Sequence, residues 1–580
     1  MKILLVAINA KYIHSNLAVY CLKSYAAKRG IEVELTEYTI NHRRDDILMD
    51  IYQRKPDVVA FSCYIWNLEF VQDIAADLYK VLPDLEIWGG GPEVSYDAEK
   101  FLAKHPEFRG IMKGEGERTF CELAGLYQIY GKEAVNKLDE CHGIVWRDPK
   151  GEISQGLPQA PISLDEVPFI YEEYENMMPF ENRILYYETS RGCPFSCSYC
   201  LSSIDKRVRL RSMELVEKEL QFFLDHKVPQ VKFVDRTFNC KHDPAMAIWK
   251  YIQEHDNGIT NFHFEVAADL LNDEEIRLIR QMRPGLIQLE IGVQSTNTDT
   301  IREIRRTMRL EEVREHVARI KEKGNIHQHL DLIAGLPYED IKSFRKSFDD
   351  VYSMRPDQLQ LGFLKVLKGS YMQEMQQEYE LRYKDEPPYE VLSTKWLPYS
   401  DVIELKGIEE MVEIYYNSGQ FTHVVEALVK NYASAYQMYQ DLWQYYEEHD
   451  YMGIQHRRSA RYEIVLDFVK EKYPEQADVM RELLTYDYYL RENAKSRPEF
   501  AGEDATDKRF VRAFYEEEEK ERKHLPGYEQ FDRNQMRKMT HLEYFPHMGK
   551  MLLFDYKFRN PLNQEARTCM IKKDSLERRG

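Results

Sequence analysis

Short apolar runs alternate with amphipathic segments along the first 150 residues of the chain. The apolar runs predict buried strands, at residues 2–7, 31–38, 57–62, 85–88 and 110–112. Apolar residues at three- and four-residue spacing predict helices between them, at residues 16–29, 45–54, 68–82 and from 117 onward. This alternation predicts a doubly wound parallel sheet over residues 1–150, flavodoxin-like in class. Ligands of such sheets bind beyond the carboxyl ends of the strands, where glycines follow the fourth and fifth runs, at Gly89-Gly90-Gly91 and Gly114-Glu115-Gly116.

A second alternation of strands and helices covers residues 181–372. Its strand-like runs lie at residues 184–189, 231–234, 262–266, 286–291, 329–333 and 359–364. Helical spacing occupies the intervals, at residues 213–226, 273–282, 310–323 and 338–354. The pattern predicts a second parallel α/β domain built from six strand–helix units.

Two further stretches differ in composition from these domains. Residues 151–180 are acidic and rich in proline (Pro158, Pro161, Pro168 and Pro179), which predicts an extended linker. Residues 373–580 predict a mainly helical domain, with helices at 401–418, 421–449, 460–472 and 477–492 and a terminal strand at 552–556. The charge run at residues 516–519 is typical of a solvated helix face.

Composition limits the class of protein. The chain has 580 residues, a formal net charge of −19 and 43% hydrophobic residues, which argues against a nucleic-acid backbone as its main partner. No apolar run approaches the length of a membrane span, and the first residues lack the pattern of a signal peptide. Six of the nine cysteines are scattered without a disulfide framework, so we expect a reducing, cytoplasmic setting.

The other three cysteines lie within eight residues, as Cys193, Cys197 and Cys200, directly after the strand-like run 184–189. Thiolates this close on a turn-forming segment are expected to serve one metal centre. Structural zinc sites and common iron–sulfur carriers are closed by four protein ligands. A three-cysteine loop therefore leaves one position open for a substrate or cofactor. The alternative is a zinc knuckle or a chance cluster of cysteines.

This loop, with Tyr199 before its last cysteine, resembles the cluster loop of the radical S-adenosylmethionine (radical SAM) superfamily. The resemblance implies a [4Fe–4S] cluster held by Cys193, Cys197 and Cys200, whose open iron binds SAM. One electron from the cluster would cleave SAM to a 5′-deoxyadenosyl radical. The six strand–helix units match the partial barrel of that core, with cofactor and substrate at the carboxyl ends of the strands.

The first domain resembles the cobalamin-binding domain of the B12-dependent radical SAM class. In that class a serine-containing turn and a Gly-Gly pair line the channel for the nucleotide tail, which implies roles for Ser62, Gly89 and Gly90. The Asp-x-His-x-x-Gly motif that donates a histidine to cobalt is absent, and His14 is interpreted as a loop histidine. The alternative is a flavodoxin-like domain whose glycines form only tight turns.

The same resemblance implies SAM-binding residues at the strand ends of the core. They are Asp235, with Asn239 as a second candidate, Glu265 with Asp269 beyond it, Gln294, Ser295, Asp331 and Gly335. For each residue the alternative is a strand-end polar group that bonds to loop backbone. The basic residues at 201–211 either neutralise anionic groups of a cofactor or belong to the solvated surface, and the sequence favours neither interpretation.

Together these features predict a radical SAM enzyme with a [4Fe–4S] cluster, SAM and cobalamin that methylates an unactivated carbon of a small molecule. A flavodoxin or ferredoxin would supply the electron. The alternatives are B12-dependent radical cyclisation or rearrangement, tRNA methylthiolation, and a non-catalytic iron–sulfur or B12 sensor. Residues 373–580 resemble a helical extension of unknown function, and the substrate is not indicated by the sequence.

Overall fold

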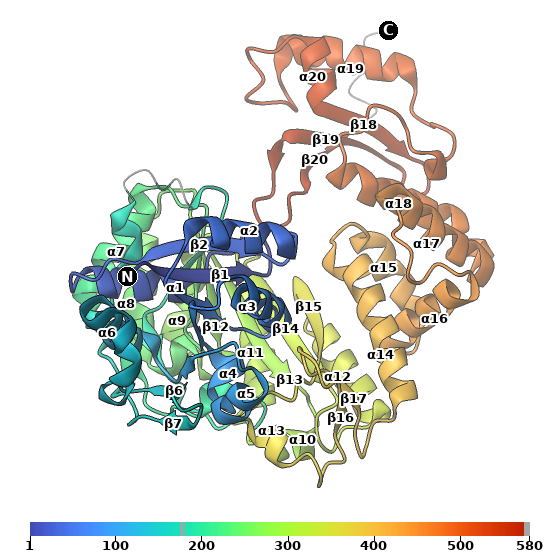
Figure 1. The fold of residues 1–580 in the computed structure, drawn as a ribbon. Coiled ribbons are helices and arrows are strands. Elements are labelled where there is room, and N and C mark those ends of the chain that lie inside the picture. Colours follow the sequence, from blue (N-terminus) through green and yellow to red (C-terminus); the bar gives the residue numbers. More distant parts are fainter. Residues whose placement is uncertain (175–176, 178–179, 573–580) are drawn as a thin grey trace. The chain divides into compact units, whose positions relative to one another are not determined.

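The computed structural model of the chain describes residues 1–174, 177 and 180–572 (Figure 1). Pro179 and part of the predicted 151–180 linker lie outside the described residues, as does the end of the predicted 373–580 domain. The chain forms two compact units. The first unit comprises Met1–Ile326, Ile333–Asp340 and Phe363–Tyr399, and the second comprises His327–Leu332, Ile341–Gly362 and Ser400–Gly580.

The predicted N-terminal parallel sheet is present in the first unit (Figure 1). Its strands follow the order β2-β1-β3-β4-β5-β6-β7. They are β1 (Ile3–Asn9), β2 (Glu34–Thr39), β3 (Val58–Ser62), β4 (Glu86–Gly90), β5 (Gly110–Met112), β6 (Ile144–Arg147) and β7 (Ile153–Gln155). The first five are parallel, and β6 and β7 add antiparallel strands at one edge. This order is flavodoxin-like, with its crevice where the chain passes from β1 to β2 on one side and to β3 on the other.

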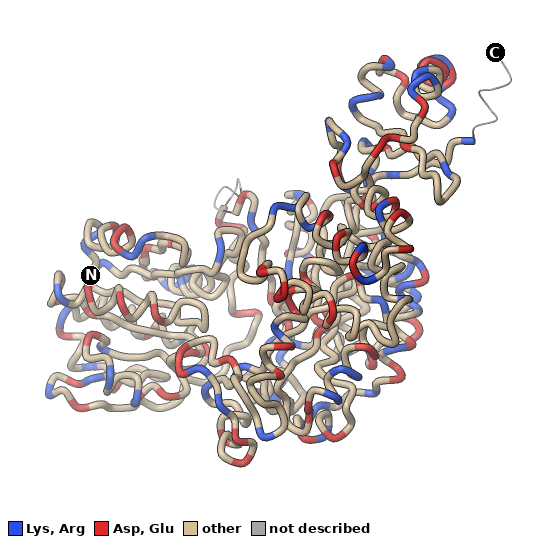
Figure 2. Tube along the Cα trace, turned by 90° about the vertical axis from the view of Figure 1, so that its right-hand side faces the viewer, with Lys and Arg blue, Asp and Glu red and all other residues tan. Residues whose placement is uncertain are grey.

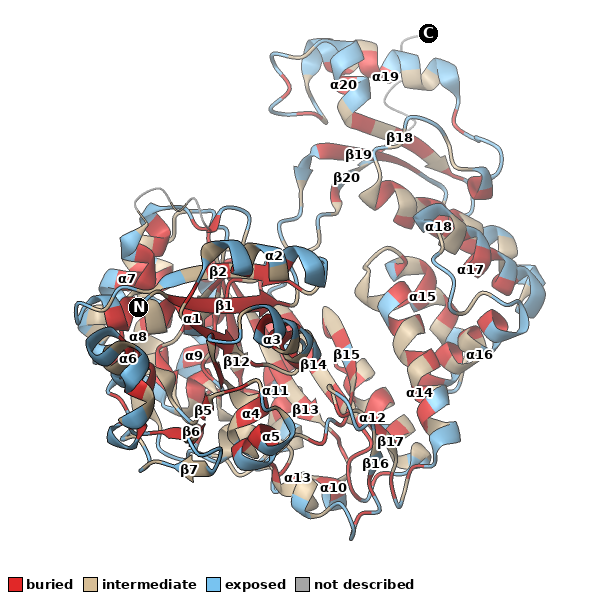
Figure 3. Cartoon of the chain, viewed as in Figure 1, coloured by how far each residue is buried: buried red, intermediate tan, exposed pale blue. Residues whose placement is uncertain are grey.

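Helices cover both faces of this sheet, because alternate apolar side chains of each strand point to opposite faces. One apolar core joins the sheet to α2 (Arg44–Arg54), α3 (Leu68–Val81) and α5 (Ala98–Lys104). A second core joins the opposite face to α1 (Leu17–Ala27) and α6 (Gly116–Tyr130). Figure 3 shows the buried residues concentrated in the strands and on the inner sides of these helices.

The antiparallel pair β6 and β7 was not predicted from the sequence. These strands are only four and three residues long and no helix separates them, so they lack the apolar runs that mark the parallel strands. Strand β7 lies within residues 151–180, which the proline content assigned to a linker.

Residues 181–372 contain strands at all six predicted places. They are β8 (Leu185–Tyr187), β11 (Gln230–Phe233), β12 (Asn261–Val266), β13 (Ile287–Gln294), β14 (His327–Ala334) and β15 (Gln358–Phe363). Strands β8, β11, β12 and β13 are neighbours in one parallel sheet. The helices between the strands are α7 (Met213–Asp225), α8 (His242–Glu254), α9 (Asp273–Gln281), α10 (Thr298–Glu303), α11 (Leu310–Lys321) and α12 (Ile341–Ser353). The predicted parallel α/β core is therefore confirmed.

Strand β13 shows which face of this sheet carries the polar groups. Burial alternates strictly along it, so Ile287, Leu289, Ile291 and Val293 are buried. Gln288, Glu290, Gly292 and Gln294 are partly accessible and lie on the opposite face. The predicted Gln294 therefore lies on the same, partly accessible face of the sheet as Gly292.

The second unit contains the predicted helical part of the chain, confirmed as α14 (Tyr399–Val412), α15 (Thr422–Leu428), α16 (Ala435–Glu448), α17 (Arg458–Lys472) and α18 (Ala477–Arg491). The single helix predicted at 421–449 is wrong, because a 3₁₀ turn ends α15 and Ser434 begins α16 as its N-cap. A three-stranded antiparallel sheet, β18 (Thr540–Phe545), β19 (Lys550–Arg559) and β20 (Ala566–Ile571), surrounds the one strand predicted here. Of the helices that the structure describes, none is both long and apolar enough to cross a bilayer.

The charge run at residues 516–519 is not a fully solvated helix face. It lies on α19 (Lys508–Glu521), and Glu518 is buried. The Glu518 carboxylate accepts hydrogen bonds from the backbone N–H groups of His524 and Leu525, both at 3.0 Å, and lies 2.7 Å from His524 Nδ1. The carboxylate therefore holds the turn that follows the helix.

We predict that Glu518→Ala lowers the free energy of unfolding of the second unit by about 3 kcal/mol, because it removes the acceptor of buried donors. Thermal or urea unfolding, followed by circular dichroism, measures the change. Glu517→Ala, on the same helix but less buried, should change stability by no more than about 0.5 kcal/mol. Equal losses in the two variants would contradict the buried role of Glu518.

Candidate cofactor site at the strand ends

The cysteine loop follows β8 and is held by backbone contacts on one side. Gly192 has a φ of +98°, and a Cβ at this position would collide with the carbonyl oxygen of Arg207. The N–H of Cys193 donates to the carbonyl oxygen of Asp205 at 2.9 Å. The segment 205–207 therefore packs directly against the start of the loop.

The opposite side of the loop is also fixed by backbone bonds. The N–H of Ser198 donates to the carbonyl oxygen of Ile304 at 2.9 Å, and the N–H of Met372 donates to the carbonyl oxygen of Ser198 at 3.2 Å. The N–H of Cys200 donates to the carbonyl oxygen of Cys197 at 3.2 Å, which closes a tight turn between these cysteines. The loop conformation is thus set by neighbouring segments as well as by its own sequence.

The three thiols differ in exposure and in neighbours. Cys193 is buried with its Sγ 3.8 Å from Thr237 Oγ1, and Cys197 and Cys200 are partly exposed. Burial raises the pKa of Cys197, and the Arg306 guanidinium, whose Nη1 lies 3.8 Å from the Cys197 Sγ, opposes that rise. A cation beside the sulfur favours the thiolate that metal binding requires.

No group of three His, Cys, Asp or Glu side chains in the described part of the chain is arranged to bind a single metal ion. A cluster spaces its thiolates by the width of its own iron–sulfur core, so its ligands stand wider apart than those of one zinc ion. Three cysteine thiols on one loop are the donor set of a cluster with three protein ligands, and the assignment of Cys193, Cys197 and Cys200 to such a cluster stays a prediction.

Arg306 is a site residue that sequence reasoning missed. Its guanidinium donates to Tyr199 Oη at 3.2 Å, to the Cys197 sulfur and to the carbonyl oxygen of Gly292. Among the described residues, no carboxylate pairs with this cation and its buried Nε has no hydrogen-bond partner. A partly buried guanidinium without a carboxylate partner, beside the cysteine loop, suits a carboxylate ligand. The arginine-rich run at residues 302–309 concealed it, because most of its members are surface residues.

Gln294 lies in an unusual backbone conformation at the end of β13. Its φ is +73°, which non-glycine residues rarely adopt, and such outliers are common at functional sites. Its side chain folds back over Gly292, where a Cβ would overlap the Gln294 amide nitrogen. Among the described residues, its buried Oε1 accepts no hydrogen bond. This acceptor fits a ligand that carries a hydroxyl or ammonium group.

The predicted Asp235 is buried next to the strand that leads into the cysteine loop. It accepts hydrogen bonds from the N–H of Thr189 at 3.0 Å and from Thr189 Oγ1 at 2.6 Å. Burial raises the pKa of Asp235 to about 6. Asn239 exchanges two hydrogen bonds of 2.9 Å with the backbone of Ala267. These contacts support the strand ends, and a role for Asp235 in binding SAM stays a prediction.

The remaining predicted SAM residues lie at separate places. Ser295 donates to Glu339 Oε1 at 2.7 Å, and Gly335 has a φ of +88° with its would-be Cβ 2.7 Å from Val391 Cγ1. Glu265 is paired with Glu290 in the register of β12 and β13. Asp331 lies on β14, 3.0 Å from His329. Their roles toward SAM stay predictions.

The predicted cobalamin edge is formed by the ends of β3 and β4. Ser62 and Gly90 are register partners, and Ser62 Oγ accepts a hydrogen bond from Asn16 Nδ2 at 3.1 Å. Gly91 has a φ of +116°, and a Cβ there would collide with the carbonyl oxygen of Cys63. The neighbouring Tyr64 and Trp66 rings stack at 4.5 Å with an interplanar angle of 5°. The edge thus offers hydroxyl, amide, backbone and flat aromatic groups.

His14 does not serve as a metal-ligand candidate at this edge. Its Nδ1 lies 2.6 Å from Tyr186 Oη on β8, and the N–H of Ile184 donates to the carbonyl oxygen of Ile13 at 2.8 Å. Burial and nearby lysines lower the pKa of His14, so its ring stays neutral. The loop after β1 is thereby fastened to the core sheet. Ser62, the Gly89-Gly90 backbone and the Tyr64 and Trp66 rings would fit the side groups and tail of a cobalamin, and His14 is engaged elsewhere.

Ion pairs join the N-terminal sheet to the cysteine loop within the first unit. Arg191 Nη2 lies 2.8 Å from Glu117 Oε1 and 2.8 Å from Glu188 Oε2. Arg209 pairs with Glu115 in the same way. The glycine loop after β5 is therefore engaged by arginines that flank the cysteines. Two of the four basic residues in the stretch 201–211 form such ion pairs. They are Arg209 and Arg211, whose Nε donates to the buried Glu219 at 2.8 Å.

Near the end of β4, two contacts tie the N-terminal sheet to the segment after β15. The buried Glu93 accepts a hydrogen bond from Tyr389 Oη at 2.9 Å, and Lys368 Nζ lies 3.4 Å from Asp97 Oδ2. The ring of Tyr96 lies against Gly369, and Met372, three residues further along, donates its N–H to the carbonyl oxygen of Ser198 in the cysteine loop. The cobalamin edge and the cysteine loop are therefore close neighbours in the first unit.

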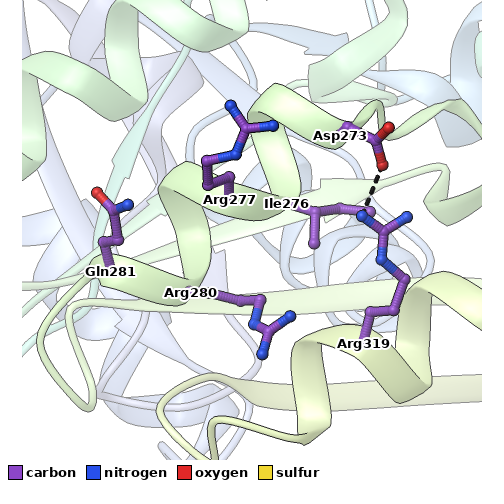
Figure 4. A pocket seen from close by; sticks show the side chains of 6 residues that line it. All are labelled: Asp273, Ile276, Arg277, Arg280, Gln281 and Arg319. Atoms are coloured by element: carbon purple, nitrogen blue, oxygen red, sulfur yellow. Dashed lines mark hydrogen bonds and ion pairs between the residues drawn. The ribbon is translucent and has the colours of Figure 1, made fainter.

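A separate surface hollow lies between the outer helices α9 and α11 (Figure 4). It is lined by Asp273, Ile276, Arg277, Arg280, Gln281 and Arg319. Arg319 pairs with Asp273 at 2.6 Å, and Arg280 pairs with Glu322 at 3.0 Å. None of the predicted site residues lines it, so we assign it no part in the cofactor site.

Comparison with known families gives three matches along the chain. Residues 3–124 match the family described as B12 binding domain, and residues 187–351 match the Radical SAM superfamily. Residues 377–560 match a family described as protein of unknown function (DUF4080).

Curated relatives match about half of the chain. The 2-(S-pantetheinyl)-carbapenam-3-carboxylate methyltransferase of Streptantibioticus cattleyicolor is 27% identical over 313 residues, which are 50% of this chain and 44% of that protein. The anaerobic magnesium-protoporphyrin IX monomethyl ester cyclase of Rubrivivax gelatinosus is 22% identical over 54% of this chain and 57% of that protein. The matched region is thus less than two thirds of either relative.

A solved structure shares the fold over a larger part. The cobalamin-dependent SAM radical enzyme OxsB, solved with aqua-cobalamin and SAM bound, superposes with a TM-score of 0.59 at 16% identity. The match covers 84% of this chain and 78% of that chain. At this identity the likeness establishes the fold.

We predict that Arg306→Ala weakens SAM binding by about 10- to 100-fold, since a charge-assisted hydrogen bond contributes roughly 1.5–3 kcal/mol. Equilibrium dialysis with the anaerobically reconstituted protein measures the affinity. Iron content should stay near that of the wild type, because the three thiols remain. Arg305→Ala, one residue away and exposed, is the matched control and should bind SAM normally. Unchanged affinity in Arg306→Ala would refute the carboxylate assignment.

We also predict that His14→Ala leaves the electron paramagnetic resonance spectrum of bound cob(II)alamin unchanged, because the imidazole is engaged with Tyr186. A histidine on cobalt would add nitrogen splitting to the spectrum, and its loss in the variant would contradict the structure. Tyr186→Phe, which frees the imidazole, is the matched control variant.

Proposed function

We propose that this chain, which belongs to the radical SAM superfamily and carries a B12-binding domain, methylates an unactivated carbon of a small molecule. When bound, the [4Fe–4S] cluster and SAM supply a 5′-deoxyadenosyl radical and cobalamin supplies the methyl group. The single observation that carries the proposal is the contact of a three-thiol loop with Arg306, a partly buried cation that has no carboxylate partner among the described residues.

The residues of the chain mainly bind and shield in this proposal. Arg306 would bind the SAM carboxylate beside Cys197, and Gln294 would accept a hydrogen bond from its amino group or ribose. Tyr199 holds the guanidinium in place through its hydroxyl. Asp235 fixes Thr189 and so the entry to the loop. A carbon radical reacts with accessible groups, so this chemistry requires a site that excludes water once the substrate is bound.

The position of the cobalamin edge supports methyl transfer. The contacts of Glu93 with Tyr389 and of Asp97 with Lys368 hold the end of β4 near the segment that closes the core. The methylated carbon has to meet both the radical and the methyl donor, so the two cofactors need to lie on the same face of the first unit. The relative from Streptantibioticus cattleyicolor is named as a methyltransferase, which agrees with this chemistry.

Radical cyclisation with B12 is the second candidate, because one relative is named as a cyclase. The product distinguishes the two reactions, since only methylation adds a carbon from labelled SAM. For tRNA methylthiolation a second cluster would be needed in the N-terminal domain. There Cys21, Cys63 and Cys121 are buried on separate elements, namely α1, the turn after β3, and α6, and so they do not form a cysteine loop like that of residues 193–200.

The partner and setting follow from the same chemistry. An electron for the cluster would come from a one-electron carrier such as flavodoxin or ferredoxin. All nine cysteines are free, which agrees with a reducing compartment such as the cytoplasm.

We predict that the anaerobically reconstituted protein binds about four irons and one cobalamin and forms 5′-deoxyadenosine from SAM. Cys197→Ala should lose this cleavage, because the cluster loses one of its three ligands. Iron analysis, the cobalamin absorption spectrum and chromatography of the nucleoside measure these outcomes.

Cys569→Ala is the matched control, since this cysteine lies on β20 in the second unit. It should retain iron and cleavage. Cleavage that survives in Cys197→Ala would contradict the cluster assignment. Absent cobalamin absorption in protein that still cleaves SAM would remove methyl transfer alone.

A further inference from the structure

The cysteine loop is flanked on both sides by exposed basic residues. On one side, Lys206 and Arg207 belong to the segment that packs against Gly192, and Lys206 Nζ donates to Ser196 Oγ at 2.6 Å. On the other side, Arg305 lies between Ile304, which accepts the hydrogen bond from Ser198, and Arg306, which contacts Cys197. We call Lys206, Arg207 and Arg305 the loop-flanking cations.

These cations differ from the arginines beside them. Arg191, Arg209 and Arg211 are all paired with carboxylates. Within the part of the chain that the structure describes, no carboxylate pairs with a loop-flanking cation. Asp205, the acidic neighbour of Lys206, is compensated by Arg209 at 3.0 Å. The Arg305 guanidinium lies over the ring of Tyr371 at 3.6 Å, a contact that does not neutralise it, so net positive charge remains at the cysteine loop.

This local charge stands out against the rest of the molecule. The chain has a formal net charge of −19, and Figure 2 shows acidic and basic residues interspersed along the trace. An acidic protein repels acidic partners over most of its surface, so an uncompensated basic face selects where such a partner approaches. Beside the cations, Ile204 exposes 53% of its surface, an apolar contact at the same place.

We propose that the loop-flanking cations and Ile204 form the docking face for an acidic flavodoxin. The inference rests on the proposed function, which needs an electron at the cysteine loop. One electron would pass from the reduced flavin to the centre held by the three thiolates, so the flavin is oxidised by one electron and the centre is reduced by one. The apolar edge of a flavin fits the exposed Ile204, and the acidic rim of the carrier fits the cations.

The location makes this face suitable for electron entry. Segment 205–207 touches Gly192 and bonds to Cys193, and turn 304–306 bonds to Ser198 and touches Cys197. A carrier on these segments is therefore separated from the thiols by one layer of backbone. The basic hollow between α9 and α11 has its arginines largely paired and touches no part of the loop, so it is the weaker candidate.

The test is the affinity of oxidised flavodoxin for the full-length protein, measured by calorimetry at low and high salt. The double variant Lys206→Glu/Arg207→Glu should raise the Kd at least tenfold at low salt. The difference should shrink at high salt, because screening weakens contacts between exposed charges. Arg305→Glu, on the other side of the loop, should weaken binding in the same direction and is independent of any damage to segment 205–207.

The matched control is Lys250→Glu/Arg277→Glu, which makes the same charge change at exposed positions on α8 and α9. It should alter the Kd by less than twofold. A second readout compares SAM cleavage driven by reduced flavodoxin with cleavage driven by dithionite. Arg305→Glu, whose native guanidinium lies over the ring of Tyr371 at 3.6 Å and is not a cofactor-site residue, should lose at least threefold of the flavodoxin-driven rate and keep the dithionite-driven rate.

Three results would overturn the inference: a Kd within twofold of wild type in the double variant, an equal loss in the control pair, or an equal loss with dithionite. Failure of the proposed function looks different. In that case wild-type protein would cleave no SAM with either reductant, although the charge dependence of flavodoxin binding could still be present.

Discussion

The site depends on three cysteines, Cys193, Cys197 and Cys200, which lie on one loop directly after the end of β8. In this molecule, backbone bonds from segments 205–207, 304–306 and 372 fix the loop, so the thiols need not hold it themselves. Arg306, whose guanidinium contacts Cys197 and Tyr199, lacks a carboxylate partner among the described residues. The three thiols are therefore available to a metal centre, and the Arg306 guanidinium is available to an anionic group.

Much of this arrangement was predictable from the sequence, because it rests on local patterns. Buried parallel strands require continuous apolar runs, so β1, β3, β5 and the core strands were found nearly at their observed bounds. Arg306 was not found, because its role comes from burial, and nothing in the run of arginines separates the buried member from the exposed ones. The buried Glu518 was missed for the same reason, since only tertiary packing places His524 and Leu525 over it.

The predicted cofactor residues divide according to what their neighbours require. Gly335 is required by its close contact with Val391, as are Gly91 and Gly192, which are not among the predicted residues, by contacts with neighbouring backbone; the protein needs these glycines with or without a ligand. Asp235 and Ser295 have protein partners as well. Gln294 is different, because its backbone is strained and its buried oxygen lacks a donor among the described residues. Neither the strained backbone nor the unpaired oxygen stabilises the fold, so Gln294 is the stronger indication of a ligand.

The ion pairs around the cysteine loop suggest why the N-terminal sheet and the core act as one unit. Arg191 precedes the first cysteine by two residues and pairs with Glu117 at the start of α6. A movement of α6 would therefore move Arg191 and the cysteine loop with it. Arg209 and Glu115 repeat the connection one step away. Such partly buried pairs contribute modest net stability but are costly to separate. Here the ion pairs hold the start of α6 at a fixed position relative to the cysteine loop. A methyl donor and a radical source can act on one substrate only when they are held at a fixed separation.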